Sequence, residues 1–356
     1  MKNRKLNIGI VGAGFMGQLA HIKNYAEIST CNVVALAEFR PELRKQVASR
    51  YQIPRSYESH NELINDPEVE AVIVVTPRQL TGQVAFDCLK AGKHVFTEKP
   101  MAGTLKQGQT LVNEAKKQKV QYVIGYMKRY DEGVVEAKNY LDKVIEDSEL
   151  GSVLFVRAHC FMGDSFCNPS GYISTKEEVP DYLEGWPTHP DWVPKSYELD
   201  FTGYLNTYSH DINLLRFLFG KTPKPEYVNF TNMDGRIAVL NFDNFICSLE
   251  TGRSDYHYWD EHIQIYFKKG HISIKLSPPL LRNSVAKVVI YISGEKPQKK
   301  TFSGNFTWAF KRQAEAFVKD ILSGKESKNP GSDSLEDLRL CEEMWKMQIR
   351  QNPNKE

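Results

Sequence analysis

Hydrophobic and polar positions alternate with two different periods along the first 125 residues. Short, almost continuous apolar runs are typical of strands buried on both faces of a parallel sheet, whereas apolar positions three and four residues apart indicate helices. This alternation predicts βαβ units and an α/β Rossmann domain with a doubly wound parallel sheet. The predicted strands span residues 6–11, 32–38, 70–76, 94–98 and 121–125. The predicted helices span residues 15–28, 41–51, a segment ending near Lys90, and 105–117. A further short helix is predicted to begin at Ser59, because Ser59 and Glu62 have the spacing of a capping box.

The pattern changes after Asp131. A predicted helix at 132–146 leads to a predicted strand at 153–161, and several strands follow between 226 and 291. Few helical patterns intervene, so this second sheet is predicted to be open and largely antiparallel, within an α+β domain. Two further helices, at 310–322 and 334–350, close the chain.

Composition and charge narrow the function classes. The 356 residues are 41% hydrophobic and 25% charged, which is typical of a folded globular protein. The 46 Lys and Arg residues nearly balance the 44 Asp and Glu residues, so the chain lacks the basic excess that binding to nucleic-acid phosphates needs. No apolar run approaches the roughly 20 residues that cross a bilayer. Glycines interrupt the first apolar segment, which favours a strand over a signal peptide. We expect a cytoplasmic protein that binds neither nucleic acid nor membrane.

The cysteines predict no disulfide framework and no metal centre. All six are scattered without CxxC spacing, so reduced thiols are expected. His159, Cys160 and Cys167 are too few ligands for a zinc site on their own. We therefore expect no bound metal.

Residues 12–17, Gly-Ala-Gly-Phe-Met-Gly, fit the pattern GxGxxG between a predicted strand and a predicted helix. In this pattern Gly12 permits a tight turn, Gly14 lets a pyrophosphate approach the backbone, and Gly17 lets the helix pack closely on the strand. Glu38 ends the next strand, where a carboxylate binds the hydroxyls of the adenosine ribose. Because a 2′-phosphate would meet this carboxylate, NAD is favoured over NADP, although Arg40 could pair with such a phosphate.

Four further segments carry a resemblance to a known family. Thr97-Glu98-Lys99-Pro100 follows one predicted strand and Thr76-Pro77 ends the strand before it. Residues 125–130 read Gly-Tyr-Met-Lys-Arg-Tyr, and residues 203–210 read Gly-Tyr-Leu-Asn-Thr-Tyr-Ser-His. In this order the segments resemble those of the Gfo/Idh/MocA oxidoreductases, which include glucose–fructose oxidoreductase and inositol dehydrogenase.

The resemblance spans residues 6 to about 220. It implies that residues 1–127 form an NAD(P)-binding domain, and that residues 128–356 form a domain for substrate binding and oligomerisation. Together with the glycine pattern it implies a cofactor site formed by Gly12, Gly14, Phe15, Met16, Gly17, Glu38, Arg40, Thr76, Pro77, Glu98 and Lys99.

Lys99 and His210 are the candidate catalytic residues. Oxidation of an alcohol requires removal of the hydroxyl proton as hydride leaves the same carbon, and a histidine suits this proton transfer. A Lys ammonium beside the oxygen stabilises the developing alkoxide, and Lys99 ends a predicted parallel strand at the edge where ligands bind. On the helix expected at 204–219, Asn206 lies four residues before His210 and on the same face, at a position where the family usually has Asp. We therefore expect His210 to be less basic than its counterpart in the family.

Residues 160–201 form an insertion that is expected to be mostly loop and contains eight aromatic residues. Sugar rings stack on Trp and Tyr, so these aromatics either form a wall of the substrate site or pack a subunit interface, and the sequence leaves both open. Arg129 has two comparable interpretations, a substrate contact and a surface ion pair. The predicted substrate-binding residues are Lys99, Tyr126, Arg129, Trp186, Asn206 and His210.

The function that the resemblance implies is reversible NAD-dependent oxidation of a secondary ring hydroxyl of a pyranose sugar or glycoside, with carbon 3 of a glucoside as the first choice. Three alternatives stay open. They are an inositol dehydrogenase, a glycoside-cleaving enzyme that oxidises its substrate transiently with a tightly bound NAD, and a nucleotide-binding regulatory protein without chemistry. A sheet covered on one face also predicts a homo-oligomer, a dimer or tetramer, formed through the C-terminal sheet.

Overall fold

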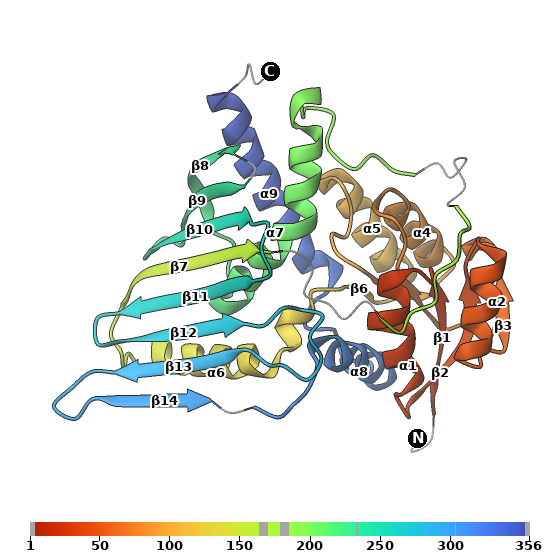
Figure 1. The fold of residues 1–356 in the computed structure, drawn as a ribbon, viewed down its shortest axis with the longest axis horizontal. Coiled ribbons are helices and arrows are strands. Elements are labelled where there is room, and N and C mark those ends of the chain that lie inside the picture. The colour runs from red at the N-terminus through yellow and green to blue at the C-terminus, as the bar shows by residue number, and fades with distance from the viewer. Residues whose placement is uncertain (1–3, 164–169, 179–184, 233, 303, 353–356) are drawn as a thin grey trace. The chain divides into compact units, whose positions relative to one another are not determined.

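The computed structural model describes residues 4–163, 170–178, 185–232, 234–302 and 304–352 (Figure 1). The chain divides into two compact units. The first comprises Met1–Tyr126, Pro169–Val193 and Phe310–Leu338, and the second comprises Met127–Asn168, Pro194–Ala309 and Arg339–Glu356. The division predicted at residue 127 lies beside the first boundary, but two later segments return to the first unit. The grouping therefore differs from two continuous domains, because contacts distant in sequence determine where these segments pack.

The first unit contains the predicted parallel sheet. Its six strands lie in the order β3-β2-β1-β4-β5-β6, and every neighbouring pair is parallel. This order reverses direction at β1, as in a doubly wound dinucleotide-binding fold. The strands are β1 (Leu6–Val11), β2 (Cys31–Ala37), β3 (Arg55–Tyr57), β4 (Ala71–Val74), β5 (His94–Thr97) and β6 (Tyr122–Ile124).

Helices pack on both faces of this sheet, which explains why its central strands are apolar on both sides. The chain leaves the glycine-rich loop in η1, a π-helical segment that continues into α1. The capping box of Ser59 and Glu62 is present at the start of α3, as predicted. The helices of this unit are η1 (Gly17–Ile22), α1 (Lys23–Ala26), α2 (Pro41–Arg50), α3 (His60–Ile64), α4 (Arg78–Lys90), α5 (Leu105–Gln118) and α8 (Ala309–Ser323, whose first residue belongs to the second unit).

The second unit is built on an eight-stranded sheet with the order β14-β13-β12-β11-β7-β10-β9-β8. All neighbouring strands are antiparallel except β7 and β10, so the predicted, largely antiparallel sheet is confirmed. The strands are β7 (Val153–Met162), β8 (Lys224–Asn232), β9 (Gly235–Asn241), β10 (Ile246–Arg253), β11 (Trp259–Phe267), β12 (Gly270–Leu276), β13 (Lys287–Ile292) and β14 (Gln298–Phe302).

Helices cover one face of the second sheet. Helix α6 (Glu132–Glu146) packs on β12 and β13, and α7 (Glu198–Phe219) packs on β7. Along β7, Val156, Ala158 and Cys160 are buried, whereas Phe155 on the opposite face is 38% exposed. This alternation is typical of a sheet with one covered face. The remaining helical segments are η2 (Met127–Tyr130), η3 (Lys195–Tyr197) and α9 (Gly331–Gln351), which runs from the first unit into the second.

The insertion at 160–201 is shorter as a loop than predicted. Strand β7 continues to Met162, and helical structure begins at Lys195. Tyr197 and Phe201 are buried and pack edge-on against Trp345 of α9. These two aromatics are therefore core residues of the second unit and do not belong to a loop wall. Phe166, Cys167 and Tyr182 lie outside the described residues.

No helix within the described ranges is both long enough and apolar enough to span a membrane.

Candidate functional site

The carboxyl edge of the six-stranded sheet collects the predicted cofactor residues of the first unit. Because β1, β2, β4 and β5 are parallel, the segments that follow them emerge at the same edge. The glycine-rich loop follows β1, Glu38 follows β2, Thr76 follows β4, and Glu98 with Lys99 follows β5. The topology thus brings together four segments that are up to about 80 residues apart in sequence.

The glycine-rich loop, residues 12–17, contains three glycines, and a side chain would have a different effect at each of them. Gly12 has a φ of +99°, and a Cβ there would lie 2.2 Å from the carbonyl oxygen of Val75. A Cβ on Gly17 would lie 2.5 Å from the carbonyl oxygen of Gly12, so this glycine permits the close packing of the helix. A Cβ on Gly14 would meet only the Arg40 guanidinium, at 3.8 Å. The fold therefore needs Gly12 and Gly17, while Gly14 keeps a backbone surface open, which fits the approach of a pyrophosphate.

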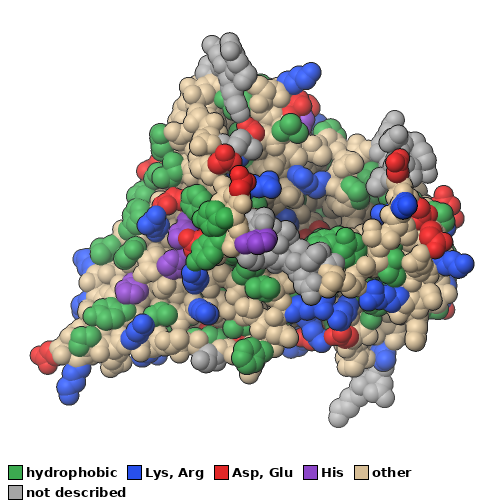
Figure 2. Space-filling view, viewed as in Figure 1, with side chains coloured by type: hydrophobic (Ala, Val, Ile, Leu, Met, Phe, Trp, Pro, Cys, Tyr) green, Lys and Arg blue, Asp and Glu red, His purple; other side chains and the backbone are tan. Residues whose placement is uncertain are grey.

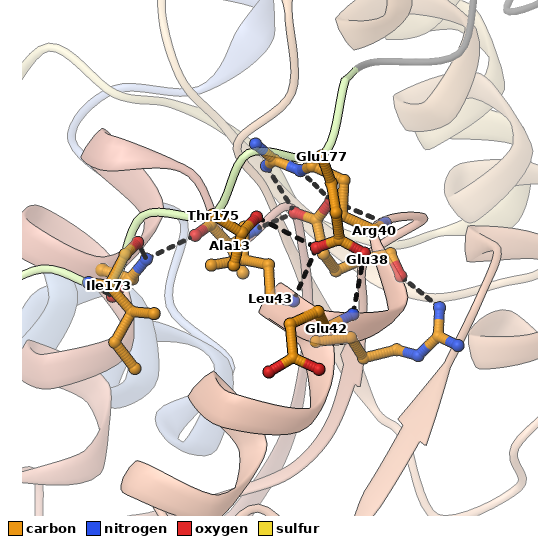
Figure 3. Close-up of polar contacts among 10 residues, drawn as sticks. Ala13, Glu38, Arg40, Glu42, Leu43, Ile173, Thr175 and Glu177 are labelled. Atoms are coloured by element: carbon orange, nitrogen blue, oxygen red, sulfur yellow. Dashed lines mark hydrogen bonds and ion pairs between the residues drawn. The ribbon is translucent and has the colours of Figure 1, made fainter.

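Glu38 is 3% exposed, and its carboxylate is surrounded by N–H donors (Figure 3). Ala13 N donates to Oε2 at 2.8 Å, which ties the end of β2 to the glycine-rich loop. Arg40 donates to the same carboxylate from Nε at 2.8 Å and from Nη2 at 3.0 Å, and its backbone N donates at 3.2 Å. A ribose hydroxyl that binds Glu38 therefore competes with the Arg40 side chain.

Glu98 and Lys99 are positioned by a histidine that the sequence reasoning missed. Nε2 of His21, in η1, lies 2.7 Å from Oε1 of Glu98, and the imidazole is 2% exposed. Lys99 N donates to the other carboxylate oxygen at 3.3 Å, and the Lys99–Pro100 peptide bond is cis. Lys99 itself is partly exposed. The only sequence signal for His21 is a histidine in the first turns after the glycine pattern, which is not specific.

Thr76 and Pro77 form the turn between β4 and α4. The Thr81 hydroxyl lies 3.1 Å from that of Thr76 and also lies within hydrogen-bond distance of the carbonyls of Thr76 and Pro77. Pro77 is the residue that precedes α4. This turn leads the chain away from the carboxyl edge and leaves Thr76 partly exposed there.

In the second unit, Asn206 and His210 lie on one stripe of α7. The predicted helix at 204–219 is confirmed, and the two residues are one turn apart and partly exposed. Tyr204, Tyr208 and Ile212 on the neighbouring positions are buried in the core. The helix therefore presents a histidine and an amide together on a partly open face of the second unit.

Three of the predicted substrate-binding residues are buried or make contacts within the protein. Arg129 is 4% exposed, its Nε donates to Asn213 Oδ1 at 2.6 Å, and its guanidinium lies over the ring of Phe217. The prediction of a surface ion pair for Arg129 is therefore wrong. Tyr126 is 3% exposed. Trp186 packs on α4, donating from Nε1 to Gln83 Oε1 at 2.6 Å. Their contacts with substrate stay predictions.

A buried charged cluster beside His210 was also missed. Lys128, in the segment used for the family resemblance, forms an ion pair with Glu261 of β11, and both residues are less than 10% exposed. Burial raises the pKa of the neighbouring Asp211 to about 7, with repulsion from Glu261 adding to the shift and Lys128 opposing it. Burial opposes the charge on Lys128, but Glu261 and Asp211 outweigh it and raise the pKa of the ammonium. Sequence alone gives no sign that these three residues meet.

Among the described residues, no three His, Cys, Asp or Glu side chains are grouped as a metal site would require.

Comparison with known proteins agrees with this geometry. Residues 6–126 match the model of the GFO_IDH_MocA family, described as an oxidoreductase family with an NAD-binding Rossmann fold. The chain is 21% identical to myo-inositol 2-dehydrogenase of Thermotoga maritima over 352 residues, covering 94% of each sequence. It is 36% identical to inositol 2-dehydrogenase of Salmonella typhimurium over 239 residues, covering 66% of this chain and 61% of that protein.

The solved structures extend the likeness to both units. A levoglucosan dehydrogenase in complex with NADH and levoglucosan superimposes with a TM-score of 0.77 at 18% identity, and the match covers 98% of each chain. At this identity the likeness shows the fold alone. The Rossmann segment, residues 6–126, belongs to the Gfo/Idh/MocA family of oxidoreductases, and the relatives that align along the whole sequence and the shared two-unit fold agree with this.

Proposed function

We propose that this protein is an NAD-dependent dehydrogenase that reversibly oxidises a secondary ring hydroxyl of a sugar-like polyol. The observation that carries the proposal is the carboxyl edge of the parallel sheet. The accessible backbone at Gly14, the buried carboxylate of Glu38, which is placed to bind ribose hydroxyls, and Lys99 all follow strands that end at this edge. The names of the relatives, inositol and levoglucosan dehydrogenases, support the same class of substrate.

Each candidate catalytic residue has its own role in this proposal. Bound nicotinamide dinucleotide supplies the hydride acceptor. His210 takes the proton of the substrate hydroxyl, because an imidazole exchanges protons near neutral pH. Lys99 stabilises the negative charge that develops on the same oxygen. Asn206, one turn from His210, hydrogen-bonds a neighbouring hydroxyl without adding charge.

A cyclic polyol such as an inositol is the first substrate to test. Two of the named relatives act on inositols by their descriptions, whereas no observation favours carbon 3 of a glucoside over other positions. The formal charge of the chain, +2, is compatible with a neutral substrate that is recognised by hydrogen bonds. Arg129, Tyr126 and Trp186 are further proposed to bind the substrate, and each is buried or packed against its own unit.

The proposal is tested with purified protein, NAD⁺ and a panel of inositols, free pyranoses and glucosides. We expect NADH absorbance to rise with at least one cyclic polyol and not with acyclic or aromatic alcohols. Absence of turnover across the panel would instead favour a nucleotide-binding regulatory protein. Release of a free aglycone from a glucoside without net NADH formation would favour the glycoside-cleaving alternative.

The cofactor is proposed to be NAD, with NADP as the weaker ligand. The buried Glu38 carboxylate supports this choice, because it favours ribose hydroxyls over a 2′-phosphate. Fluorescence titration with both oxidised and reduced forms measures the preference directly. Equal or tighter binding of NADP would contradict it. The same titration after extensive dialysis reveals whether the protein retains a tightly bound cofactor.

The protein is further proposed to form a homo-oligomer, a dimer or tetramer, through the uncovered face of the eight-stranded sheet. This face carries large side chains that are exposed in the single chain, among them Phe155 and Tyr266, at 38% and 41%. Figure 2 shows hydrophobic side chains and histidines gathered over these strands. Light scattering is the test, and a monomer at micromolar concentration would contradict the proposal.

A further inference from the structure

A strap from the insertion, defined here as residues 172–177, lies across the glycine-rich loop and the start of α2 (Figure 3). Gln18, which is 1% exposed, donates from Nε2 to the carbonyl of Ile173 at 2.9 Å, and Ile173 N donates back to Gln18 Oε1 at 2.8 Å. The ring of Tyr172 packs edge-on against Phe15 of the loop. All of these contacts lie within the first unit. The strap is therefore anchored on the proposed dinucleotide site.

The strap delivers a carboxylate to the N-terminus of α2. Oε1 of Glu177 accepts from Glu42 N and Oε2 accepts from Leu43 N, each at 2.9 Å. The Thr175 hydroxyl donates to the same carboxylate at 2.9 Å. Desolvation raises the pKa of Glu177, but these donors and the charge of Arg40 outweigh it, so the pKa is lowered. Glu177 is thus held as an anion at this helix end.

The first turn of α2 cannot satisfy these N–H groups from its own sequence. Arg40 precedes the helix and provides no side-chain cap, and Pro41 at the first position has no N–H group. The backbone N of Arg40 donates to Glu38. Glu42 and Leu43 therefore carry the free N–H donors of this turn, and both are taken by Glu177, from about 135 residues away in the chain.

The N–H groups of Glu42 and Leu43 could otherwise bind the 2′-phosphate of NADP. A 2′-phosphate on the ribose bound at Glu38 needs cationic and N–H donors close to the end of β2. The chain offers Arg40 and the two N–H groups of α2 immediately after Glu38. A helix N-terminus next to an arginine is a favourable environment for a phosphate. In this protein that environment already holds an internal carboxylate.

We propose that Glu177 occupies the anion site that would receive the 2′-phosphate of NADP, and that the strap thereby makes the protein selective for NAD. The inference rests on the proposed function, since it assumes a dinucleotide at the glycine-rich loop. Glu38 and Glu177 act together. The first takes the ribose hydroxyls, and the second removes the phosphate donors and repels a second anion. Arg40 donates to Glu38 and its charge is also attracted by Glu177, so its guanidinium is not available for a phosphate.

The experiment compares the affinity of full-length variants for NAD⁺, NADP⁺, AMP and adenosine 2′,5′-bisphosphate by calorimetric titration. Glu177→Ala empties the anion site, and Glu177→Gln removes the charge while its amide oxygen can still accept from the helix. Glu178→Gln is the matched control, because it removes an exposed carboxylate one residue further along. Circular dichroism verifies that each variant is folded.

We expect Glu177→Ala to lower the Kd for NADP⁺ relative to that for NAD⁺ by about tenfold or more, which corresponds to about 1.4 kcal/mol. The same change is expected for adenosine 2′,5′-bisphosphate relative to AMP. This change in relative affinity should become smaller with added salt. Glu177→Gln should change the ratios in the same direction but by less. Glu178→Gln should leave the ratios as in the wild type. Ratios within about twofold of wild type in folded Glu177→Ala and Glu177→Gln would overturn the inference. A wild-type protein that binds none of the four ligands would instead overturn the proposed function.

Discussion

Nε2 of His21 lies 2.7 Å from Oε1 of Glu98, so a buried imidazole holds the carboxylate that immediately precedes Lys99. The second carboxylate oxygen accepts from the backbone N of Lys99. Through these two contacts the helix after the glycine-rich loop is connected to the end of β5. The position of Lys99 therefore depends on a residue that need not touch substrate or cofactor.

The His21–Glu98 pair is expected to be strongly coupled in stability. His21→Phe and Glu98→Leu each leave a mostly buried partner without its hydrogen bond, so the double-mutant cycle should show a coupling of about 1–3 kcal/mol in the free energy of unfolding. Urea titration of the four proteins measures it. The pair of His60 and Asp87, at 3.0 Å but more exposed, is the matched control and should give less than about 1 kcal/mol. Equal coupling in the two pairs would contradict the expectation.

A side chain at Gly14 is expected to affect cofactor binding but not folding. A Cβ on Gly14 would meet only the Arg40 guanidinium, at 3.8 Å, whereas a Cβ on Gly17 would overlap the backbone of Gly12. Gly14→Ala is therefore expected to weaken NAD⁺ binding by about tenfold or more with little change in melting temperature. Gly17→Ala is the control, and it should lower the melting temperature. If Gly14→Ala leaves the Kd for NAD⁺ unchanged, the pyrophosphate does not approach the backbone at this loop.

Lys99 and His210 are expected to act in turnover more than in cofactor binding. Lys99→Ala and His210→Ala should each lower kcat by about 10²-fold or more, because each removes a group that stabilises charge or transfers a proton in the transition state. The Kd for NAD⁺ should change far less. Lys90→Ala, at the exposed end of α4, and His271→Ala, on β12, are controls from the same units. Turnover within a few-fold of wild type would remove the substituted residue from the mechanism.

Asn206 should set the acidic limit of activity. A carboxylate one turn from His210 stabilises the imidazolium form, and a general base must be neutral to accept a proton. Asn206→Asp is therefore expected to shift the acidic limb of the kcat/KM profile for oxidation to higher pH, and Asn206→Ala should leave the limb near its wild-type position. A downward shift in Asn206→Asp would contradict this role.

The local patterns of the sequence predicted the parallel sheet, the capping box at Ser59 and the helix that carries His210, because each depends on residues close together in the chain. The contacts that complete the sites depend on distant segments. Glu177 caps α2 from the insertion. The return of Pro169–Val193 to the first unit has no local signal either. The aromatic content of the insertion suggested a substrate wall, but Tyr197 and Phe201 are aromatic because they pack around Trp345.

Asp211 is expected to make stability depend on pH. Burial raises the pKa of its carboxyl from 3.8 to about 7 in the folded state, so the folded protein binds this proton more tightly than the unfolded chain. The stability that the protonated form contributes is present below about pH 4 and is lost as pH rises through about 7. Asp211→Asn removes this titration. The melting temperature of the variant, measured relative to that of the wild type, should therefore be higher at pH 8 than at pH 5. Each kcal/mol of free energy of unfolding that the wild type loses between these pH values corresponds to about 2–4 °C. Asp243→Asn, whose side chain is 72% exposed in the same unit, is the control. Calorimetric scans at the two pH values test this, and equal differences for Asp211→Asn at both would show that the buried carboxyl does not titrate there.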